Sequence, residues 1–381
     1  MKDERTKSDF DVLMMQRCLE LARRAAGKTS PNPLVGSVIV KDGEIIGEGF
    51  HPKFGQPHAE VFALGDAGEL ARGATVYVNL EPCNHYGKTP PCSSALIEAK
   101  VAKVVTGMVD PDPRVAGGGI KKLRDAGIEV VVGVEEAACR RLNEAFIQRI
   151  THKQTFGILK YAMTLDGKIA ATTGHSAWVT SKDSRHLVHR VRSACDAVIV
   201  GGNTVRRDNP NLTTHGITEH NPLRVVMSRS LDLPSECNLW HTDIASTIVF
   251  TENNNSAQQQ KLIDRGVEIV SVAQLTPKVV TEYLYQQGKS KVLWECGGTL
   301  AAKAIADGTV QKVMAFVAPK IIGGTSAPSP VDDLGLSKMT DALELKEIEV
   351  KTIFPDLLIE GYLPNIEPPI DKSRDSLFTD S

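Results

Sequence analysis

The sequence predicts two consecutive α/β domains, on three grounds. A chain of 381 residues exceeds the usual size of one domain. Apolar runs typical of strands alternate with helical segments along most of the chain. A polar break, Thr151-His152-Lys153-Gln154, interrupts this alternation. We therefore expect one domain over residues 1–150, a second over 155–363, and a disordered polar tail over 364–381.

Apolar periodicity and turn residues give the order of the expected elements. Ser8 and Asp9 are candidate caps of a first helix, whose apolar positions recur at helical spacing as far as Ala26. Asp42-Gly43 predicts a tight hairpin turn. The first half contains expected strands 35–40, 45–50, 74–80, 104–108 and 128–132, and expected helices from about 58, 92–100, 120–126 and 137–150. The second half contains expected strands 157–162, 197–200, 223–227, 247–250, 268–270, 292–295, 313–317 and 357–361, and expected helices 181–194 and 300–306.

The composition is that of a soluble globular protein, with 41% hydrophobic and 24% charged residues. A net charge of −2 offers no basic field to phosphate backbones, so no nucleic-acid partner is expected. No apolar run approaches the roughly 18 residues that span a bilayer, so no membrane partner is expected. The polar start at residues 1–5 differs from a secretory signal, and the seven cysteines are an odd set. We expect an intracellular enzyme, in the bacterial cytoplasm or, after removal of a transit peptide, in the plastid stroma.

The strongest chemical signal is His58-Ala59-Glu60, followed by Pro82-Cys83 and then by Cys92. One imidazole and two thiolates suit a catalytic Zn²⁺ site, which keeps a fourth position for water. A metal in this position lowers the pKa of that water. Glu60 is then the proton shuttle and not a ligand. The alternative is a surface histidine with two ordinary buried thiols, and the combination of residues argues against it.

This arrangement resembles the cytidine-deaminase superfamily, with one departure. The general pattern has two residues between the cysteines, whereas this chain has eight, at residues 84–91. That longer loop is similar to the one in the bifunctional riboflavin biosynthesis deaminase-reductase family, and the similarity extends along nearly the whole chain. The resemblance implies a cytidine-deaminase-like three-layer domain followed by a dihydrofolate-reductase-like α/β domain.

The resemblance also implies a substrate for the first half. This is 2,5-diamino-6-(5-phosphoribosylamino)pyrimidin-4-one, whose ring 2-amino group is hydrolysed to a carbonyl. Asn32 matches the family position that holds the pyrimidine edge, although an asparagine in this context also caps turns. His51, His85 and Lys88 are further candidates for the ring or the phosphate.

In the second half, Gly297-Gly298-Thr299 lies between an apolar strand and a helix. Two glycines there allow backbone N–H groups to approach a phosphate, but such a pair also forms ordinary tight turns. A G-x-G-x-x-G fingerprint is absent from the sequence. Taken alone, this motif is weak evidence for a cofactor.

The rest of that half resembles the reductase domain of the same family. The resemblance implies NADPH-dependent reduction of the ribosyl group to ribityl, giving 5-amino-6-(5-phosphoribitylamino)uracil. It assigns to NADPH the residues Ala162, Trp178, Thr204, Asp208, Gly297, Gly298 and Thr299. It assigns to the substrate Ser176, Arg192, Leu212 and Glu295, and Lys160 is a further candidate for substrate contact or proton delivery. Simpler alternatives are a core position for Trp178, a surface charge for Arg192 and a turn for Asp208.

Two basic positions concern phosphate binding. Where many family members carry arginine, this chain has His215, which predicts weaker or more pH-dependent phosphate binding at that position. Arg229 follows an expected strand and is a candidate for the 2′-phosphate of NADPH.

Three other functions compete with the bifunctional enzyme. The first is a monofunctional deaminase with an inactive reductase-like domain. The second is a non-catalytic binding protein, which has no need of an open metal site. The third is a nucleic-acid deaminase, which leaves more than half the chain unexplained. The family resemblance further implies homo-oligomer formation through the reductase domain.

Overall fold

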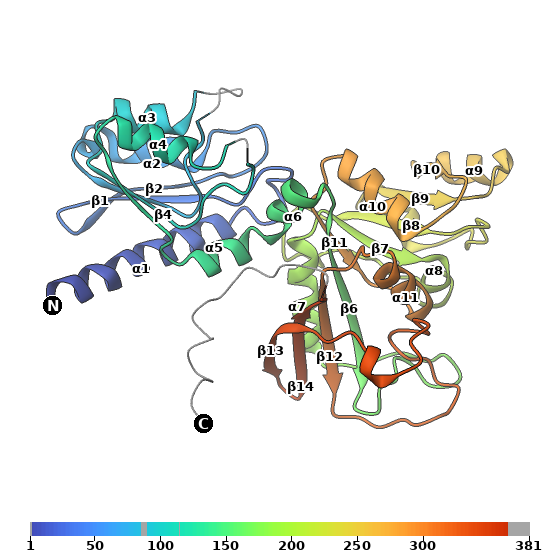
Figure 1. Ribbon diagram of the computed structural model, residues 1–381. Helices are drawn as coiled ribbons and strands as arrows, with labels where there is room; N and C mark the ends of the chain where they lie inside the picture. Colours follow the sequence, from blue (N-terminus) through green and yellow to red (C-terminus); the bar gives the residue numbers. More distant parts are fainter. Residues whose placement is uncertain (1, 85–89, 114, 365–381) are drawn as a thin grey trace, which may run out of the picture. The chain divides into compact units, whose positions relative to one another are not determined.

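The computed structural model describes residues 2–84, 90–113 and 115–364, which form two compact units (Figure 1). The first extends through Lys153 and the second begins at Gln154. Apart from Pro364, the tail predicted to be disordered lies outside the described residues.

The first unit is a five-stranded mixed sheet between two layers of helices. Its strands, in the order β2-β1-β3-β4-β5, are β1 (Gly36–Lys41), β2 (Glu44–Phe50), β3 (Thr75–Val78), β4 (Lys103–Thr106) and β5 (Glu129–Val132). Its α-helices are α1 (Lys2–Arg23), α2 (Ala59–Ala67), α3 (Cys92–Glu98), α4 (Gly118–Asp125), α5 (Glu136–Leu142) and α6 (Glu144–His152). One apolar core lies between the sheet and α1, α5 and α6, and a second lies between the sheet and α2, α3 and α4 (Figure 1). This is the three-layer arrangement expected from the sequence.

The second unit is built on a nine-stranded sheet in the order β10-β9-β8-β7-β11-β6-β12-β14-β13. Its strands are β6 (Phe156–Thr164), β7 (Ala197–Gly201), β8 (Leu223–Met227), β9 (Thr247–Thr251), β10 (Glu268–Ser271), β11 (Lys291–Trp294), β12 (Lys312–Ala318), β13 (Lys346–Ile353) and β14 (Asp356–Tyr362). Its α-helices are α7 (Lys182–Ser193), α8 (Gly202–Asp208), α9 (Ser256–Ile263), α10 (Pro277–Gln286) and α11 (Gly298–Ala306). Neighbouring strands from β10 to β12 are parallel, whereas β14 and β13 add antiparallel strands at one edge.

Three expectations about elements were wrong. Helix α1 begins at Lys2, so Ser8 and Asp9 lie inside it and do not cap it, because its polar first turns carry no apolar periodicity. The helix expected over 137–150 is two helices that meet at Asn143. Strand β13 was not expected, because its sequence is rich in charged residues.

Candidate functional site

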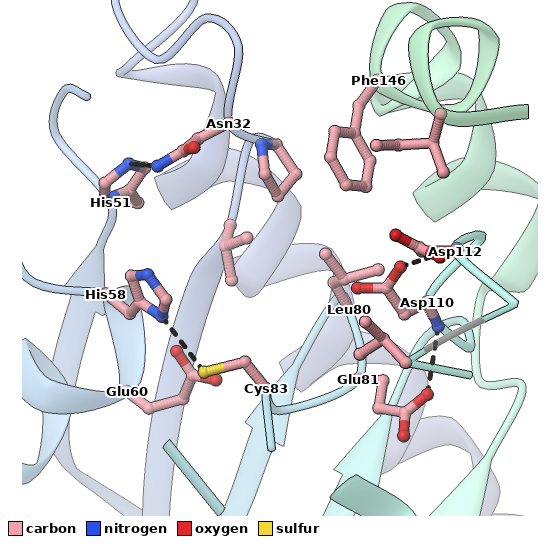
Figure 2. A pocket seen from close by; sticks show the side chains of 14 residues that line it. Asn32, His51, His58, Glu60, Leu80, Glu81, Cys83, Asp110, Asp112 and Phe146 are labelled. Atoms are coloured by element: carbon pink, nitrogen blue, oxygen red, sulfur yellow. Dashed lines mark hydrogen bonds between the residues drawn. The ribbon is translucent and has the colours of Figure 1, made fainter. Parts of the chain in front are cut away.

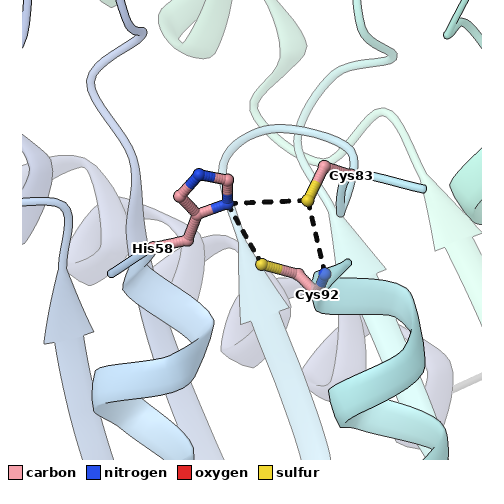
Figure 3. A group of neighbouring side chains, drawn as sticks. All are labelled: His58, Cys83 and Cys92. Carbon is pink, nitrogen blue, oxygen red and sulfur yellow. Dashed lines mark hydrogen bonds between the residues drawn. The ribbon is translucent and has the colours of Figure 1, made fainter. Parts of the chain in front are cut away.

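The three predicted metal ligands converge in the first unit (Figure 3). His58 immediately precedes α2, Cys92 is the first residue of α3, and Cys83 lies between β3 and α3. His58 Nδ1 lies 3.3 Å from Cys92 Sγ and 3.5 Å from Cys83 Sγ. The ligand atoms all lie within 4.8 Å of one another. One imidazole nitrogen and two sulfurs at this separation fit Zn²⁺.

Glu60 lies beside this group, in the first turn of α2, and is only 3% exposed. It lines a cavity of about 270 Å³ together with His58 and Cys83 (Figure 2). Burial, followed by the charge of Cys83, raises the pKa of Glu60 to about 6. Two of the metal ligands, His58 and Cys83, and the predicted proton shuttle therefore face the same cavity.

Asn32 and His51 form part of the wall of the same cavity. His51 Nδ1 lies 3.0 Å from the Pro57 carbonyl oxygen, which only accepts, so Nδ1 carries the proton. His51 Nε2 then accepts a hydrogen bond from Asn32 Nδ2 at 3.1 Å. Burial lowers the pKa of His51, which favours this neutral ring. His51 therefore orients the Asn32 amide. His85 and Lys88 lie outside the described residues.

A second cavity, of about 600 Å³, lies in the second unit. Its lining includes every predicted cofactor residue: Ala162, Trp178, Thr204, Asp208, Gly297, Gly298 and Thr299. It also includes five of the predicted substrate residues: Lys160, Ser176, Arg192, Leu212 and Glu295. Since β6 and β11 are neighbouring parallel strands, Lys160 and Glu295 meet although 135 positions separate them in the chain.

Glu295 lies at the centre of a charged group in this cavity. Arg192 binds it in a bidentate manner, with Nε–Oε1 at 2.5 Å and Nη2–Oε2 at 3.0 Å. Lys160 Nζ lies 3.2 Å from Oε2. Burial alone raises the pKa of Glu295, but the charges of Arg192 and Lys160 outweigh it and hold the pKa well below its ordinary value. The Arg192 fork is therefore already engaged by a carboxylate.

The simpler interpretations of Trp178 and Arg192 do not hold, whereas that of Asp208 stays open. Trp178 is 70% exposed and lies under the Arg185 guanidinium, 4.3 Å from the ring centroid, so it is not a core residue. Arg192 is mostly buried and is not a surface charge. Asp208 ends α8 and lines the cavity, where burial raises its pKa.

The Gly297-Gly298-Thr299 turn opens α11 at one side of this cavity. A side chain on Gly298 would place its Cβ 2.7 Å from the Ser329 carbonyl oxygen, so only glycine fits there. Thr299 Oγ1 donates to Asp332 Oδ2 at 2.6 Å. The room that Gly298 leaves is filled by Asp332 and Ser329. Backbone N–H groups at the start of a helix nevertheless favour a phosphate.

His215 and Arg229 are not among the described residues that line the second cavity. His215 stacks on His189, with ring centroids 4.1 Å apart. Burial and the nearby charge of Arg192 lower the pKa of His215, so its ring is neutral at pH 7. The cations that line the cavity besides Lys160 and Arg192 are Arg185 and Arg207, which the sequence analysis did not single out.

Other lining residues were also missed. In the first cavity these are Glu81, Asp110 and Asp112, and in the second Asp332. Glu81 directly precedes the Pro82-Cys83 motif, which was a usable signal. Asp110, Asp112 and Asp332 carry no local motif, because tertiary packing alone brings them to the cavities.

Two family models match the chain. Residues 155–359 match the RibD C-terminal domain, and residues 8–108 match the cytidine and deoxycytidylate deaminase zinc-binding region. The chain belongs to the RibD family. It is 63% identical over 357 residues to riboflavin biosynthesis protein RibD of Synechocystis, a match that covers 93% of this chain and 96% of that protein.

Two further relatives support the RibD assignment. The chain is 45% identical to the chloroplastic riboflavin biosynthesis protein PYRR of Arabidopsis thaliana, over 96% of this chain and 63% of that protein. A structure from Thermotoga maritima is 38% identical, with a TM-score of 0.84, and the match covers 94% of this chain and 99% of that one. That structure is of a diaminohydroxyphosphoribosylaminopyrimidine deaminase/5-amino-6-(5-phosphoribosylamino)uracil reductase.

These matches confirm the predicted fold class and the predicted enzyme classes of both halves. A RibD protein joins a zinc-binding deaminase domain to a reductase domain, and its cofactors are Zn²⁺ and NADPH. Both halves match full-length relatives, which disfavours a monofunctional deaminase with an inactive second half. Within the described residues, every helix is too short or too polar to cross a membrane.

Proposed function

We propose that the chain carries out two consecutive steps of riboflavin biosynthesis, one in each unit. The first hydrolyses the 2-amino group of 2,5-diamino-6-(5-phosphoribosylamino)pyrimidin-4-one. The second reduces the ribosyl group and gives 5-amino-6-(5-phosphoribitylamino)uracil. The observation that carries this proposal is the convergence of His58, Cys83 and Cys92 beside Glu60, since a non-catalytic binder has no use for such a site.

In the first step, the chain's residues bind the pyrimidine and move protons. Zn²⁺ held by His58, Cys83 and Cys92 supplies an activated water. Glu60 takes a proton from the attacking water and delivers it to the departing amine, while oxygen bonds to the ring carbon and the C–N bond breaks. The second water proton ends on the adjacent ring nitrogen, which leaves a carbonyl and ammonia. Asn32, oriented by His51, holds the pyrimidine edge. His85 and Lys88 contact the ring or the phosphate.

In the second step, NADPH supplies a hydride to C1′ of the ribosyl group. The C1′–O bond opens and the ring oxygen takes up a proton. Lys160 is the proton donor or a direct substrate contact, and Glu295 and Ser176 bind the sugar. Arg192 fixes the Glu295 carboxylate through two hydrogen bonds. We also assign Leu212 and His215 to substrate binding. His215 is not among the described residues that line the cavity.

The cofactor side of that cavity contains Ala162, Trp178, Thr204, Asp208 and the turn 297–299. The exposed Trp178 ring offers a flat surface for stacking, and the turn at the start of α11 receives a phosphate.

The reductase unit also carries an exposed sheet edge that suits a second copy of this chain. Strand β13 ends the nine-stranded sheet and exposes Ile348 and Val350, and Phe354 beside it is 83% exposed. These three apolar side chains form an exposed patch on a strand whose other residues are largely charged. We propose that the oligomer forms by burial of this patch against a second copy. The compartment is the cytoplasm in a bacterium or the plastid stroma in a plant.

A paired assay tests the two-site function. The wild type releases ammonia from the diaminopyrimidine phosphate without NADPH, and oxidises NADPH only once the deaminated intermediate has formed. In Glu60→Gln, bound zinc is retained and ammonia release falls by at least about 100-fold, the usual scale of acid–base catalysis. The same variant reduces the deaminated intermediate normally. Loss of both activities in a folded Glu60→Gln protein contradicts two separate sites.

A further inference from the structure

One carboxylate in the first unit has more backbone partners than its place in the sequence suggests. Glu81 lies between β3 and the metal ligand Cys83 and is 3% exposed. Its own N–H donates to the Met108 carbonyl at 2.9 Å. Its side chain points towards the segment that joins β4 to α4, as Figure 2 shows for the contact with Asp110.

The Glu81 carboxylate accepts four backbone N–H groups, two from that segment and two from the first turn of α4. Oε2 accepts from Asp110 at 3.1 Å and from Gly117 at 2.9 Å. Oε1 accepts from Gly119 at 2.9 Å and from Ile120 at 3.2 Å. A buried carboxylate with its lone pairs satisfied in this way is a strong and directional anchor. One side chain therefore holds both ends of the segment.

The anchored segment forms a wall of the deaminase cavity. Asp110, Asp112 and Val115 line it opposite the metal ligands. At the α4 end, a Cβ on Gly119 would lie 1.9 Å from the Pro82 carbonyl oxygen, so this backbone packs directly against the chain that leads to Cys83. The metal side and the opposite wall are thus held at a fixed separation through Glu81.

We infer that Glu81 is a positioning residue that sets the affinity of the deaminase site for its substrate. Its carboxylate fixes the position of the wall residues 110, 112 and 115 relative to the metal ligands. This inference depends on the proposed deaminase function. Glu81 lines the cavity, but both of its carboxylate oxygens are engaged by backbone N–H groups. Its loss therefore weakens binding of substrate and transition state alike, which raises KM and leaves kcat almost unchanged.

Glu81→Gln tests this, because an amide keeps the size of the side chain but turns an N–H group towards backbone donors. We expect KM for ammonia release to rise about tenfold while kcat stays within about threefold. One zinc per chain and the kinetics of NADPH oxidation on the deaminated intermediate remain as in the wild type. Glu81→Asp, which keeps the charge, restores part of the affinity.

Asp66→Asn is the matched control. Asp66 also accepts a backbone N–H, from Glu48 at 2.9 Å, but does not line the cavity. We expect its KM to equal that of the wild type. If Glu81→Gln does not fold, the test is hydrogen exchange in Glu81→Asp. We expect the backbone amides of residues 110, 117, 119 and 120 to exchange faster in this variant than in the wild type.

Four results separate the outcomes. An unchanged KM in Glu81→Gln overturns the positioning role. A fall in kcat together with zinc loss also overturns it and assigns Glu81 to support of Cys83. Unchanged exchange of the four amides in Glu81→Asp also overturns it. A wild type that releases no ammonia contradicts the proposed function itself, before any variant is compared.

Discussion

At the scale of single residues, the reductase cavity depends on one carboxylate shared by two cations. Glu295 holds Arg192 and Lys160 in place, and all three side chains are at most 19% exposed. Removing the carboxylate leaves two buried positive charges without a counterion, which is costly. The lowered pKa of Glu295 means that its contribution to stability is present above the ordinary pKa of glutamate and disappears as the pH falls towards the lowered value.

Glu295→Gln is therefore expected to abolish reduction and to lower the free energy of unfolding by about 3 kcal/mol. Ammonia release is unaffected. The control is Glu360→Gln. Glu360 is also a mostly buried glutamate that pairs with two lysines, Lys312 and Lys351, but it does not line the cavity. That variant retains reduction. Steady-state NADPH oxidation in both proteins is the measurement, and wild-type reduction by Glu295→Gln removes this residue from the site.

At the scale of elements, α1 packs on β1 through a contact that only glycine allows. A Cβ on Gly36 would lie 2.1 Å from the Cys18 carbonyl oxygen and 3.0 Å from the Ala22 nitrogen. Both atoms belong to the backbone of α1, so they cannot rotate away as a side chain would. The helix and the strand therefore approach as closely as their main chains permit.

Gly36→Ala is expected to lower the free energy of unfolding of the first unit by about 1–3 kcal/mol through overpacking. Gly65→Ala is the control, because Gly65 lies in α2 with open space around its Cβ position. That change is expected to be neutral or to stabilise by up to about 1 kcal/mol. Urea unfolding followed by circular dichroism measures both, and equal effects of the two changes contradict the close contact.

Local sequence predicted most elements, and it failed where distant contacts decide. Strand β13 carries charges along an edge, so it lacks the apolar run that marks the buried strands. The division between α5 and α6 depends on Asn143, whose side chain accepts from the Leu34 N–H at 2.8 Å and donates to the Leu34 carbonyl at 3.0 Å. No local pattern contains that partner.

The same distinction applies to the sites. His58, Cys83 and Cys92 were identifiable because a metal demands particular side chains at particular spacings. Asp332 meets Thr299 only through a loop 33 positions further along the chain. The substrate role expected of His215 stays a prediction, since its ring stacks on His189 and it is not among the described residues that line the cavity.

At the scale of the whole molecule, the exposed edge strand β13 bears on assembly. Val350→Lys places a charge within the exposed apolar patch of β13, which disfavours burial of that patch against a second copy. We expect the variant to have a smaller mass than the wild type in light scattering. The control is Ile263→Lys on α9, an equally apolar and exposed position away from β13, which keeps the wild-type mass. An unchanged mass in Val350→Lys contradicts assembly through this edge.

The strand order of the second unit also determines which strands lack a partner while the chain is being synthesised. Strand β6 opens the unit, yet its two neighbours in the sheet are β11 and β12, which are translated long after it. All of the first unit has been synthesised before β11 and β12 appear. During this interval both edges of β6 remain unpaired. A truncated chain that ends before residue 312 lacks β12. Its strand β6 therefore keeps one unpaired apolar edge, and such a chain is expected to aggregate or to be degraded.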